Sequence, residues 1–145
     1  WITKADHDLG TAKITYLHIP DYLDTVIFHC QQAVEKYLKS FLIHHQTNFK
    51  FSHDLIYLLD IISQIDIEFE EFYDVVSELQ GCAVEIRYPD ETIFLSKEKI
   101  EKGIKTAKMI RDTVTFKMNI DIDYNEIILI KEAKFSSFFV GKDYR

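Results

Sequence analysis

Few residues in this chain interrupt regular structure, and that scarcity constrains the fold more than any other feature. Its 145 residues include four glycines and two prolines, the residue types that most strongly break helices and strands. So few breaks favour a small number of long elements over many short strands. Because 47% of the residues are hydrophobic and 28% are charged, the chain has the composition of one globular domain rather than of a disordered segment.

Apolar residues recur at steps of three and four through most of the chain, which places them on one face of a helix. The clearest example is the segment 22–46, where Val26, Cys30, Tyr37 and Phe41 form one apolar row. The same spacing predicts four further helices. The expected helices are 2–17, 22–46, a third from Ser52 to Ile65, a fourth over 68–86, and a fifth from Ser96 to about 117.

Helix-breaking and capping residues separate these segments. Pro20 and Pro89 end the first and fourth helices, because proline lacks an amide donor and disfavours the α conformation in the residue before it. Ser52 and Ser96 are the expected N-caps of the third and fifth helices, since a serine hydroxyl accepts a hydrogen bond from first-turn amides. Short connections make an all-α, up-and-down antiparallel bundle of about five helices the expected fold of residues 1–117.

Residues 118–145 differ from the rest and form the second unit of the expected domain division. The segment IDIDY alternates apolar and acidic residues, and EIILI is a short run rich in β-branched isoleucine; both patterns are typical of strands. We expect a C-terminal extension with β character, either a strand or a hairpin packed on the bundle or on a second subunit. An amphipathic helix is the alternative.

The charge and hydropathy of the chain exclude some classes of partner. Its formal net charge is −7, whereas a protein that binds nucleic acid regardless of sequence needs a basic surface to displace counterions from phosphates. Bulk nucleic-acid binding is therefore not expected. No apolar run approaches the length of a membrane span and no signal peptide is visible, so we expect a cytoplasmic protein with no membrane partner. Because the chain begins at Trp1 without a methionine, residues upstream are expected to be missing.

The cysteines and histidines show no metal-binding or redox pattern. Cys30 and Cys82 are the only cysteines, and both fall inside apolar helical patterns, so we interpret them as reduced core thiols. The histidines do not have the H-x-x-x-H spacing or the cysteine neighbours of a zinc site. The sequence also lacks a P-loop and the glycine-rich dinucleotide fingerprint. We therefore expect neither a metal nor a cofactor.

Three short motifs, in order, resemble the HEPN family over about residues 1–117. They are FHCQQAVEKYLKSFL at 28–42, SHDL at 52–55 and RYPD at 87–90. The resemblance implies an antiparallel helical bundle that is frequently homodimeric. It also implies a minimal nucleotidyltransferase as partner, in some cases as a toxin–antitoxin pair, and nucleotide as a ligand. A catalytic branch of the family consists of metal-independent ribonucleases, built on an arginine followed by a histidine after four to six residues.

This sequence departs from that catalytic pattern. After Arg87, the positions for the histidine hold Thr92, Ile93 and Phe94, and no other arginine in the chain is followed by histidine at that spacing. Ribonuclease chemistry without a metal needs an imidazole or an equivalent group for proton transfer. We therefore expect a non-catalytic protein that binds nucleotide or partners a nucleotidyltransferase. One alternative is a HEPN ribonuclease toxin with a non-standard active site, and another is a purely structural dimer.

The candidate binding residues on the second and third helices are polar. His29, Gln32 and Lys36 share one stripe of the second helix, and they face either a phosphate-binding groove or solvent. His53 follows the expected cap, so it could donate to an anion at the helix N-terminus or make only a local hydrogen bond. Glu35 and Lys39 have the i, i+4 order that favours an ion pair.

The RYPD motif supplies the remaining candidates. Arg87 could bind a phosphate with its planar fork of donors, or it could pair with Asp90 and fix the turn. Tyr88 is a candidate platform for stacking a base. The complete predicted nucleotide- or phosphate-binding set is His29, Gln32, Lys36, His53, Arg87, Tyr88 and Asp90.

Overall fold

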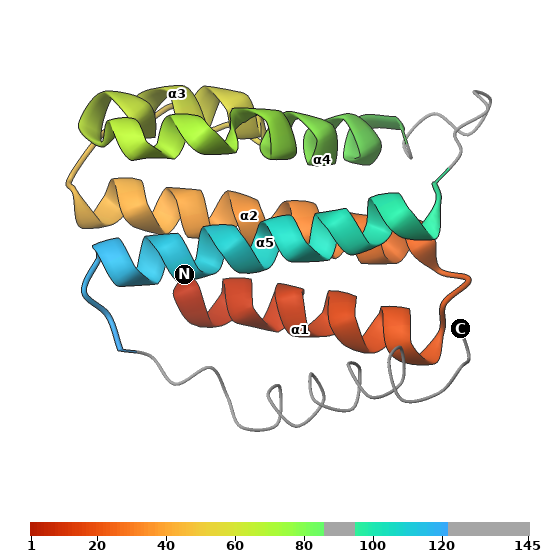
Figure 1. The fold of residues 1–145 in the computed structure, drawn as a ribbon. Coiled ribbons are helices and arrows are strands. Elements are labelled where there is room, and N and C mark those ends of the chain that lie inside the picture. Colours follow the sequence, from red (N-terminus) through yellow and green to blue (C-terminus); the bar gives the residue numbers. More distant parts are fainter. Residues whose placement is uncertain (86–94, 122–145) are drawn as a thin grey trace.

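A computed structural model describes residues 1–85 and 95–121. Every regular element in those ranges is helical (Figure 1), which confirms the expected all-helical bundle. The β character expected of the C-terminal extension falls, from residue 122 onward, outside the described residues. The division at residue 117 stays a prediction. The elements are α1 (Ile2–His18), α2 (Leu23–His44), α3 (Leu55–Ile65), the 3-10 helix η1 (Ile67–Phe72), α4 (Tyr73–Glu85) and α5 (Lys97–Lys117).

Helix α2 is the centre of the bundle, since it packs against α1, α3, α4 and α5. Its apolar row is the one that the periodicity predicts: Val26, Cys30 and Tyr37 have no exposed surface, and Phe41 has almost none. Burial on several sides explains why the apolar pattern is wider on α2 than on a helix with one buried face. Residues on the remaining polar strip of α2 are therefore held in fixed positions by a packed core.

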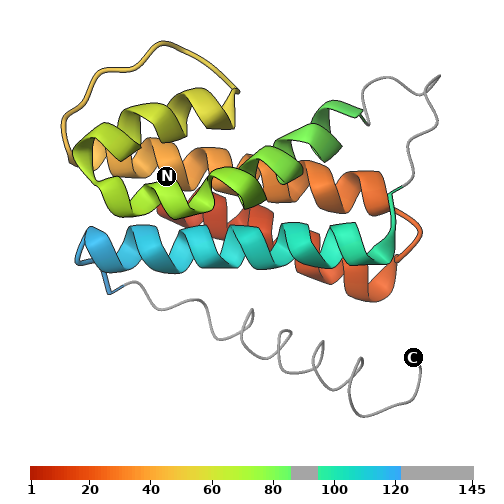
Figure 2. The same ribbon diagram turned by 45° about the horizontal axis from the view of Figure 1, so that its top comes forward.

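Helix α3 departs from the expected up-and-down order, because it runs in the same direction as α2 (Figure 2). The connection 45–54 returns along α2 before α3 begins. Gln31 Nε2 in the first half of α2 donates to the backbone oxygen of His53, at 3.2 Å. Further along, the rings of Phe41 and Phe69 lie 4.8 Å apart. A connection of this length can run back over the length of a short helix. Helices α2 and α3 can therefore run in the same direction and need not be joined by a short turn.

The caps correct one sequence prediction and confirm another. Asp54, not Ser52, is the N-cap of α3: its Oδ1 accepts hydrogen bonds from the amides of Ile56 and Tyr57 at 3.0 and 3.2 Å. The Ser52 hydroxyl instead accepts from the Asp54 amide, because the helix begins two residues later than expected. Ser96 does cap α5, with its hydroxyl accepting from the Lys99 amide at 3.2 Å.

The fourth predicted helix has two parts. It begins as the 3-10 helix η1 and continues without a break as α4. Asp66 caps η1 by accepting a hydrogen bond from the Glu68 amide at 3.0 Å. Phe69 and Phe72 of η1 are buried, so this 3-10 segment contributes to the core.

A buried ionic cluster joins α1, α2 and α5. Arg111 on α5 makes a two-point contact with the Asp6 carboxylate on α1, through Nε at 2.8 Å and Nη2 at 3.3 Å. The hydroxyl of Tyr37 on α2 donates to the same carboxylate at 2.5 Å. Burial disfavours the charge on Arg111, yet its pKa is raised because the bonded Asp6 outweighs that effect. The cluster fixes three helices relative to one another.

Candidate functional site

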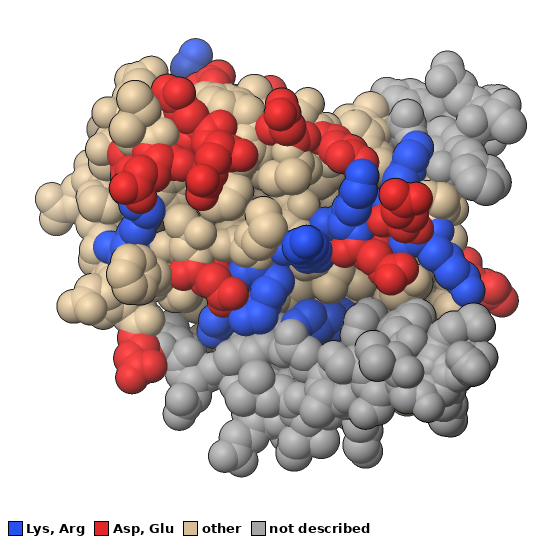
Figure 3. All heavy atoms as spheres, viewed as in Figure 1, with Lys and Arg blue, Asp and Glu red and all other residues tan. Residues whose placement is uncertain are grey.

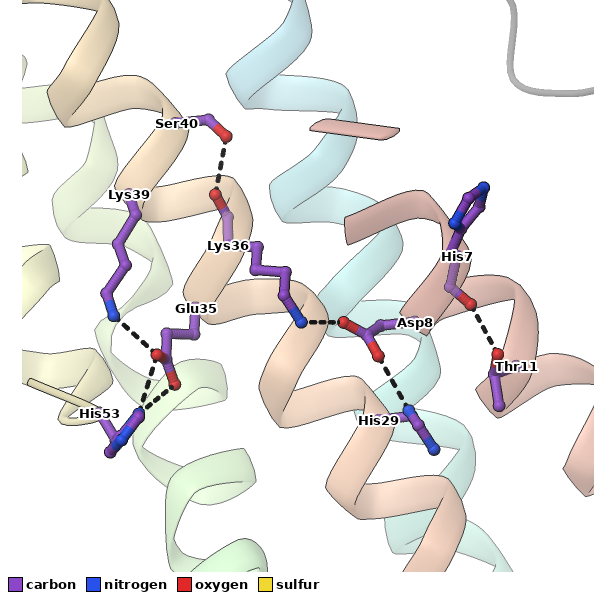
Figure 4. A network of polar contacts seen from close by, with 9 residues as sticks. All are labelled: His7, Asp8, Thr11, His29, Glu35, Lys36, Lys39, Ser40 and His53. Atoms are coloured by element: carbon purple, nitrogen blue, oxygen red, sulfur yellow. Dashed lines mark hydrogen bonds and ion pairs between the residues drawn. The ribbon is translucent and has the colours of Figure 1, made fainter. Parts of the chain in front are cut away.

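Two polar triads involve residues of α2, and each is built around one carboxylate (Figure 4). We call Asp8, His29 and Lys36 the α1 triad, because α1 supplies its carboxylate. We call Glu35, Lys39 and His53 the α3 triad, because its histidine lies just before α3. Glu35 and Lys36 are neighbours in sequence, so their side chains leave α2 in different directions and serve different triads.

The α1 triad lies at the edge of the interface between α1 and α2. His29 Nδ1 lies 2.9 Å from Asp8 Oδ1, and Lys36 Nζ donates to Asp8 Oδ2. The Asp8 side chain is 14% exposed, against 25% for His29 and 24% for Lys36. One carboxylate therefore orients a cation and an imidazole that both still reach solvent.

The α3 triad combines a buried ion pair with an exposed ring. Lys39 Nζ lies 2.7 Å from Glu35 Oε1, and both side chains are only 6% exposed, so the predicted i, i+4 pair is confirmed. His53 Nδ1 lies 2.9 and 3.2 Å from the two Glu35 oxygens, and its side chain is 55% exposed. The Lys39 ammonium also lies 5.3 Å from the centre of the Phe51 ring.

Both triads orient their histidine in the same way. His29 and His53 each place Nδ1 on a carboxylate, which fixes the ring and favours a proton on that nitrogen. Within the described ranges no residue forms a hydrogen bond with Nε2 of either ring. With respect to the described residues, each Nε2 keeps its hydrogen-bonding capacity, as a donor when the ring is charged and as an acceptor when it is neutral.

The predicted candidates are only partly brought together. His29 and Lys36 meet on Asp8, and the half-buried Gln32 lies between them on the same strip of α2. His53 lies on the opposite flank of that strip, on Glu35. Arg87, Tyr88 and Asp90 lie outside the described residues.

Sequence reasoning missed the residue that organises the α1 triad. Asp8 lies 21 residues from His29 and 28 from Lys36, so no local spacing links them. The available signal was its place beside Leu9 on the buried face of α1, since a carboxylate at the edge of a helix interface usually has a partner.

Charge is unevenly distributed over the face shown in Figure 3. Lysine side chains run along α5, and acidic side chains cluster over α3 and α4. A groove of about 230 Å³ lies between α4 and α5. Its lining includes the apolar side chains of Leu79, Cys82 and Met109 and the lysines Lys99 and Lys102. A second depression, of about 290 Å³, lies beside His53.

Neither a metal centre nor a membrane span is found in the described part of the chain. Within residues 1–85 and 95–121, no group of three or more His, Cys, Asp or Glu side chains is placed to hold a metal ion. No helix there has both the length and the apolar character needed to cross a membrane.

Comparison with known proteins assigns the bundle to a family. The helices define an all-α bundle whose central helix carries two histidine–carboxylate sites. The chain belongs to the HEPN domain family, because the model of that family, described as HEPN domain, matches residues 1–119. This confirms the resemblance that the sequence motifs carry. Comparisons with curated proteins and with solved structures found no significant match.

Proposed function

We propose that this chain is a non-catalytic HEPN-domain protein that binds a nucleotide through phosphate and partners a minimal nucleotidyltransferase. The proposal rests on the α1 triad together with the polar residues that adjoin it on α2. There, His29, Gln32 and Lys36 present polar groups to solvent from one rigid strip. Asp8 orients the two basic groups without removing their capacity to bind an anion.

The chemistry of the α1 triad suits a phosphate. An ammonium group has three donors, and Lys36 uses one of them on Asp8. When His29 is protonated, the triad carries one net positive charge, and the His29 Nε2–H can donate to a phosphate oxygen. Hydrogen bonds between charged groups of this kind are stronger than neutral ones. Gln32 adds an uncharged amide that can hydrogen-bond to a sugar or a base.

The sequence supports the non-catalytic part of the proposal. No arginine anywhere in the chain is followed by histidine after four to six residues, so the family's ribonuclease pair is absent. The net charge of −7 opposes a long polyanion, whereas a mononucleotide brings few charges. In this arrangement the nucleotidyltransferase supplies the metal-binding carboxylates and this chain forms part of the cleft. A cytoplasmic homodimer and a toxin–antitoxin pairing belong to the same proposal.

Calorimetric titration with AMP and ATP tests the proposal. We expect Lys36→Ala and Arg87→Ala each to weaken binding by about 1.5–3 kcal/mol, the range for a charge-assisted hydrogen bond. Lys108→Ala is the matched control, because Lys108 pairs with Asp112 on the exposed side of α5 and should leave affinity unchanged. Absence of binding, with or without a nucleotidyltransferase, would remove the nucleotide from the proposal.

The α3 triad favours a second candidate function, a ribonuclease with a non-standard active site. A carboxylate that orients an imidazole with a free Nε2 is the arrangement that general-base catalysis uses, and Glu35 and His53 have it. Our proposal predicts that highly purified protein does not cleave structured or single-stranded RNA in EDTA. Cleavage that persists in EDTA and is lost in both His53→Ala and Arg87→Ala would establish the ribonuclease instead.

A further inference from the structure

The groove between α4 and α5 has an apolar base. Leu79 and Cys82 of α4 lie in its lining at 3% and 5% exposure, and Val75 and Met109 extend the apolar lining along the same two helices. Its volume of about 230 Å³ approaches the lower end of the range for small-molecule sites, which is about 300 Å³. Such sites combine an apolar lining with a few well-placed polar groups.

Thr106 on α5 contributes a polar group to this lining. The residue is 4% exposed and lines the groove, yet its hydroxyl makes no hydrogen bond to any residue that the structure describes. Hydroxyls within helices can donate to the carbonyl four residues earlier, as that of Thr115 does to Arg111. The Thr106 oxygen is not fully enclosed, so an acceptor on a ligand in the groove can reach it and satisfy the hydroxyl.

The edge of the groove along α5 is basic (Figure 3). Lys99, Lys102 and Lys105 are exposed and belong to the lining. Lys102 Nζ lies 3.8 Å from Glu78 Oε1 on α4, whereas Lys99 and Lys105 form no ion pair with a described residue. Three ammonium groups and one carboxylate give the lining a net charge of +2, although the whole chain carries −7. The groove therefore attracts anions locally.

The groove also differs between its two ends, because α4 and α5 are antiparallel (Figure 1). The start of α5, with Lys99 and Lys102, lies beside the end of α4, where Cys82 is located. In the other direction, Met109 lies beside Val75 near the start of α4. The lining therefore runs from a basic end to an apolar end.

We propose that this groove binds a small anionic amphiphile, a molecule with a carboxylate head and a short hydrocarbon chain. Lys99, Lys102 and Thr106 occupy positions i, i+3 and i+7, so their donors share one stripe of α5 and can bind one carboxylate. The hydrocarbon chain lies on Leu79 and Met109, where burial removes it from water. The inference does not depend on nucleotide binding at the α1 triad.

Other occupants match the groove less well. A cation would be repelled by the net positive charge of the lining. AMP is an anion but lacks a hydrocarbon chain for the apolar base. A helix of a partner protein has a diameter of about 10 Å with its side chains, so a space of about 230 Å³ would hold less than one turn of it.

Titration of isotope-labelled protein with octanoate, followed by NMR, tests the inference. The backbone amide signals of Leu79, Thr106 and Met109 should shift and saturate, while those of His29 and Lys36 should not move. Octylamine has the same chain with the opposite charge, so it should bind at least about tenfold more weakly. From hexanoate to octanoate, affinity should rise about fourfold for each added methylene, because each one is removed from water.

Replacements on α5 separate the groove from general charge. Lys99→Gln combined with Lys102→Gln should weaken octanoate binding about fivefold or more. Lys97→Gln combined with Lys108→Gln is the matched control, since it removes equal charge from the same helix outside the lining and should have little effect. Thr106→Val keeps the shape of the side chain and removes the donor, so it should weaken octanoate binding about fivefold.

Three results would overturn the inference: no saturable shift in the groove with octanoate, equal affinity for octanoate and octylamine, or equal losses in the two double variants. Binding of an acidic amphipathic peptide without binding of octanoate would also overturn it and assign the groove to a protein partner. The comparison of octanoate with octylamine uses the wild-type protein, so it decides the matter even if a variant does not fold.

Discussion

Replacement of Asp6 by alanine should destabilise the bundle more than any loss of a surface charge. Asp6 is 5% exposed and receives hydrogen bonds from Arg111 and Tyr37. The variant leaves the guanidinium, itself 6% exposed, without its buried counterion. Breaking a buried pair by removing one partner costs about 3–5 kcal/mol, a large part of the 5–15 kcal/mol that stabilises a typical domain.

Asp112→Ala is the matched control, because Asp112 also approaches Arg111, with its Oδ1 at 3.5 Å from Nη1. Its side chain is 53% exposed, and exposed ion pairs contribute about 0.2–1 kcal/mol. The two variants therefore remove carboxylates near the same guanidinium and differ mainly in burial.

Urea unfolding followed by circular dichroism measures both variants. With a typical slope of about 1–3 kcal/mol per molar urea, Asp6→Ala should lower the midpoint by at least about 1 M, and Asp112→Ala should hardly change it. Combined replacement of Asp6 by Leu, Arg111 by Met and Tyr37 by Phe should recover most of the loss, since this cluster then contains no charged group. Equal costs for Asp6→Ala and Asp112→Ala would refute the reasoning.

Three further predictions concern the reactivity of the two thiols, the loss of stability at acidic pH and the oligomeric state. Burial raises the pKa of the Cys30 thiol to about 12, so Cys30 should resist a thiol reagent in the native protein. Cys82, which lines the α4–α5 groove, should react first. Equal reaction rates for the two thiols would contradict this prediction. The hydrogen bond from Lys117 lowers the pKa of Asp66. Because the pKa of Asp66 is lower in the folded state than in the unfolded state, its ion pair stabilises the fold at pH values above the ordinary Asp pKa. This stabilisation is lost as the pH falls through the folded-state pKa. The difference in free energy of unfolding between the wild type and Asp66→Asn is expected to be about 0.2–1 kcal/mol at neutral pH. It should shrink as the pH falls below the ordinary Asp value of 3.8; a difference that does not change with pH would be inconsistent with this pairing. Light scattering should give twice the 17.2 kDa chain mass, and a monomer at high micromolar concentration would exclude the homodimer.

The sequence predicted those features of the fold that depend on local spacing. The bounds of α1, α2 and α5 follow from apolar periodicity, and the Glu35–Lys39 pair and the Ser96 cap follow from residues within four positions of each other. The buried contact between Asp6 and Arg111 joins residues 105 positions apart, and no local pattern announces such a contact.

The site was less predictable than the fold for the same reason. The stripe of His29, Gln32 and Lys36 could be read from helical geometry, but the carboxylate that orients it comes from another helix. The direction of α3 depends on the path of the 45–54 connection, and that path brings His53 onto Glu35. The spacing of residues in the sequence does not show that the 45–54 connection folds back along α2.

We propose that the polar strip of α2 binds a nucleotide through its phosphate group. NMR titration of the labelled protein with AMP tests this binding residue by residue, because each backbone amide reports its own surroundings. We expect the shifts to be largest at His29, Gln32 and Lys36, and to be absent from the α4–α5 groove around Met109. Shifts confined to that groove, or none at saturating AMP, would contradict the claim.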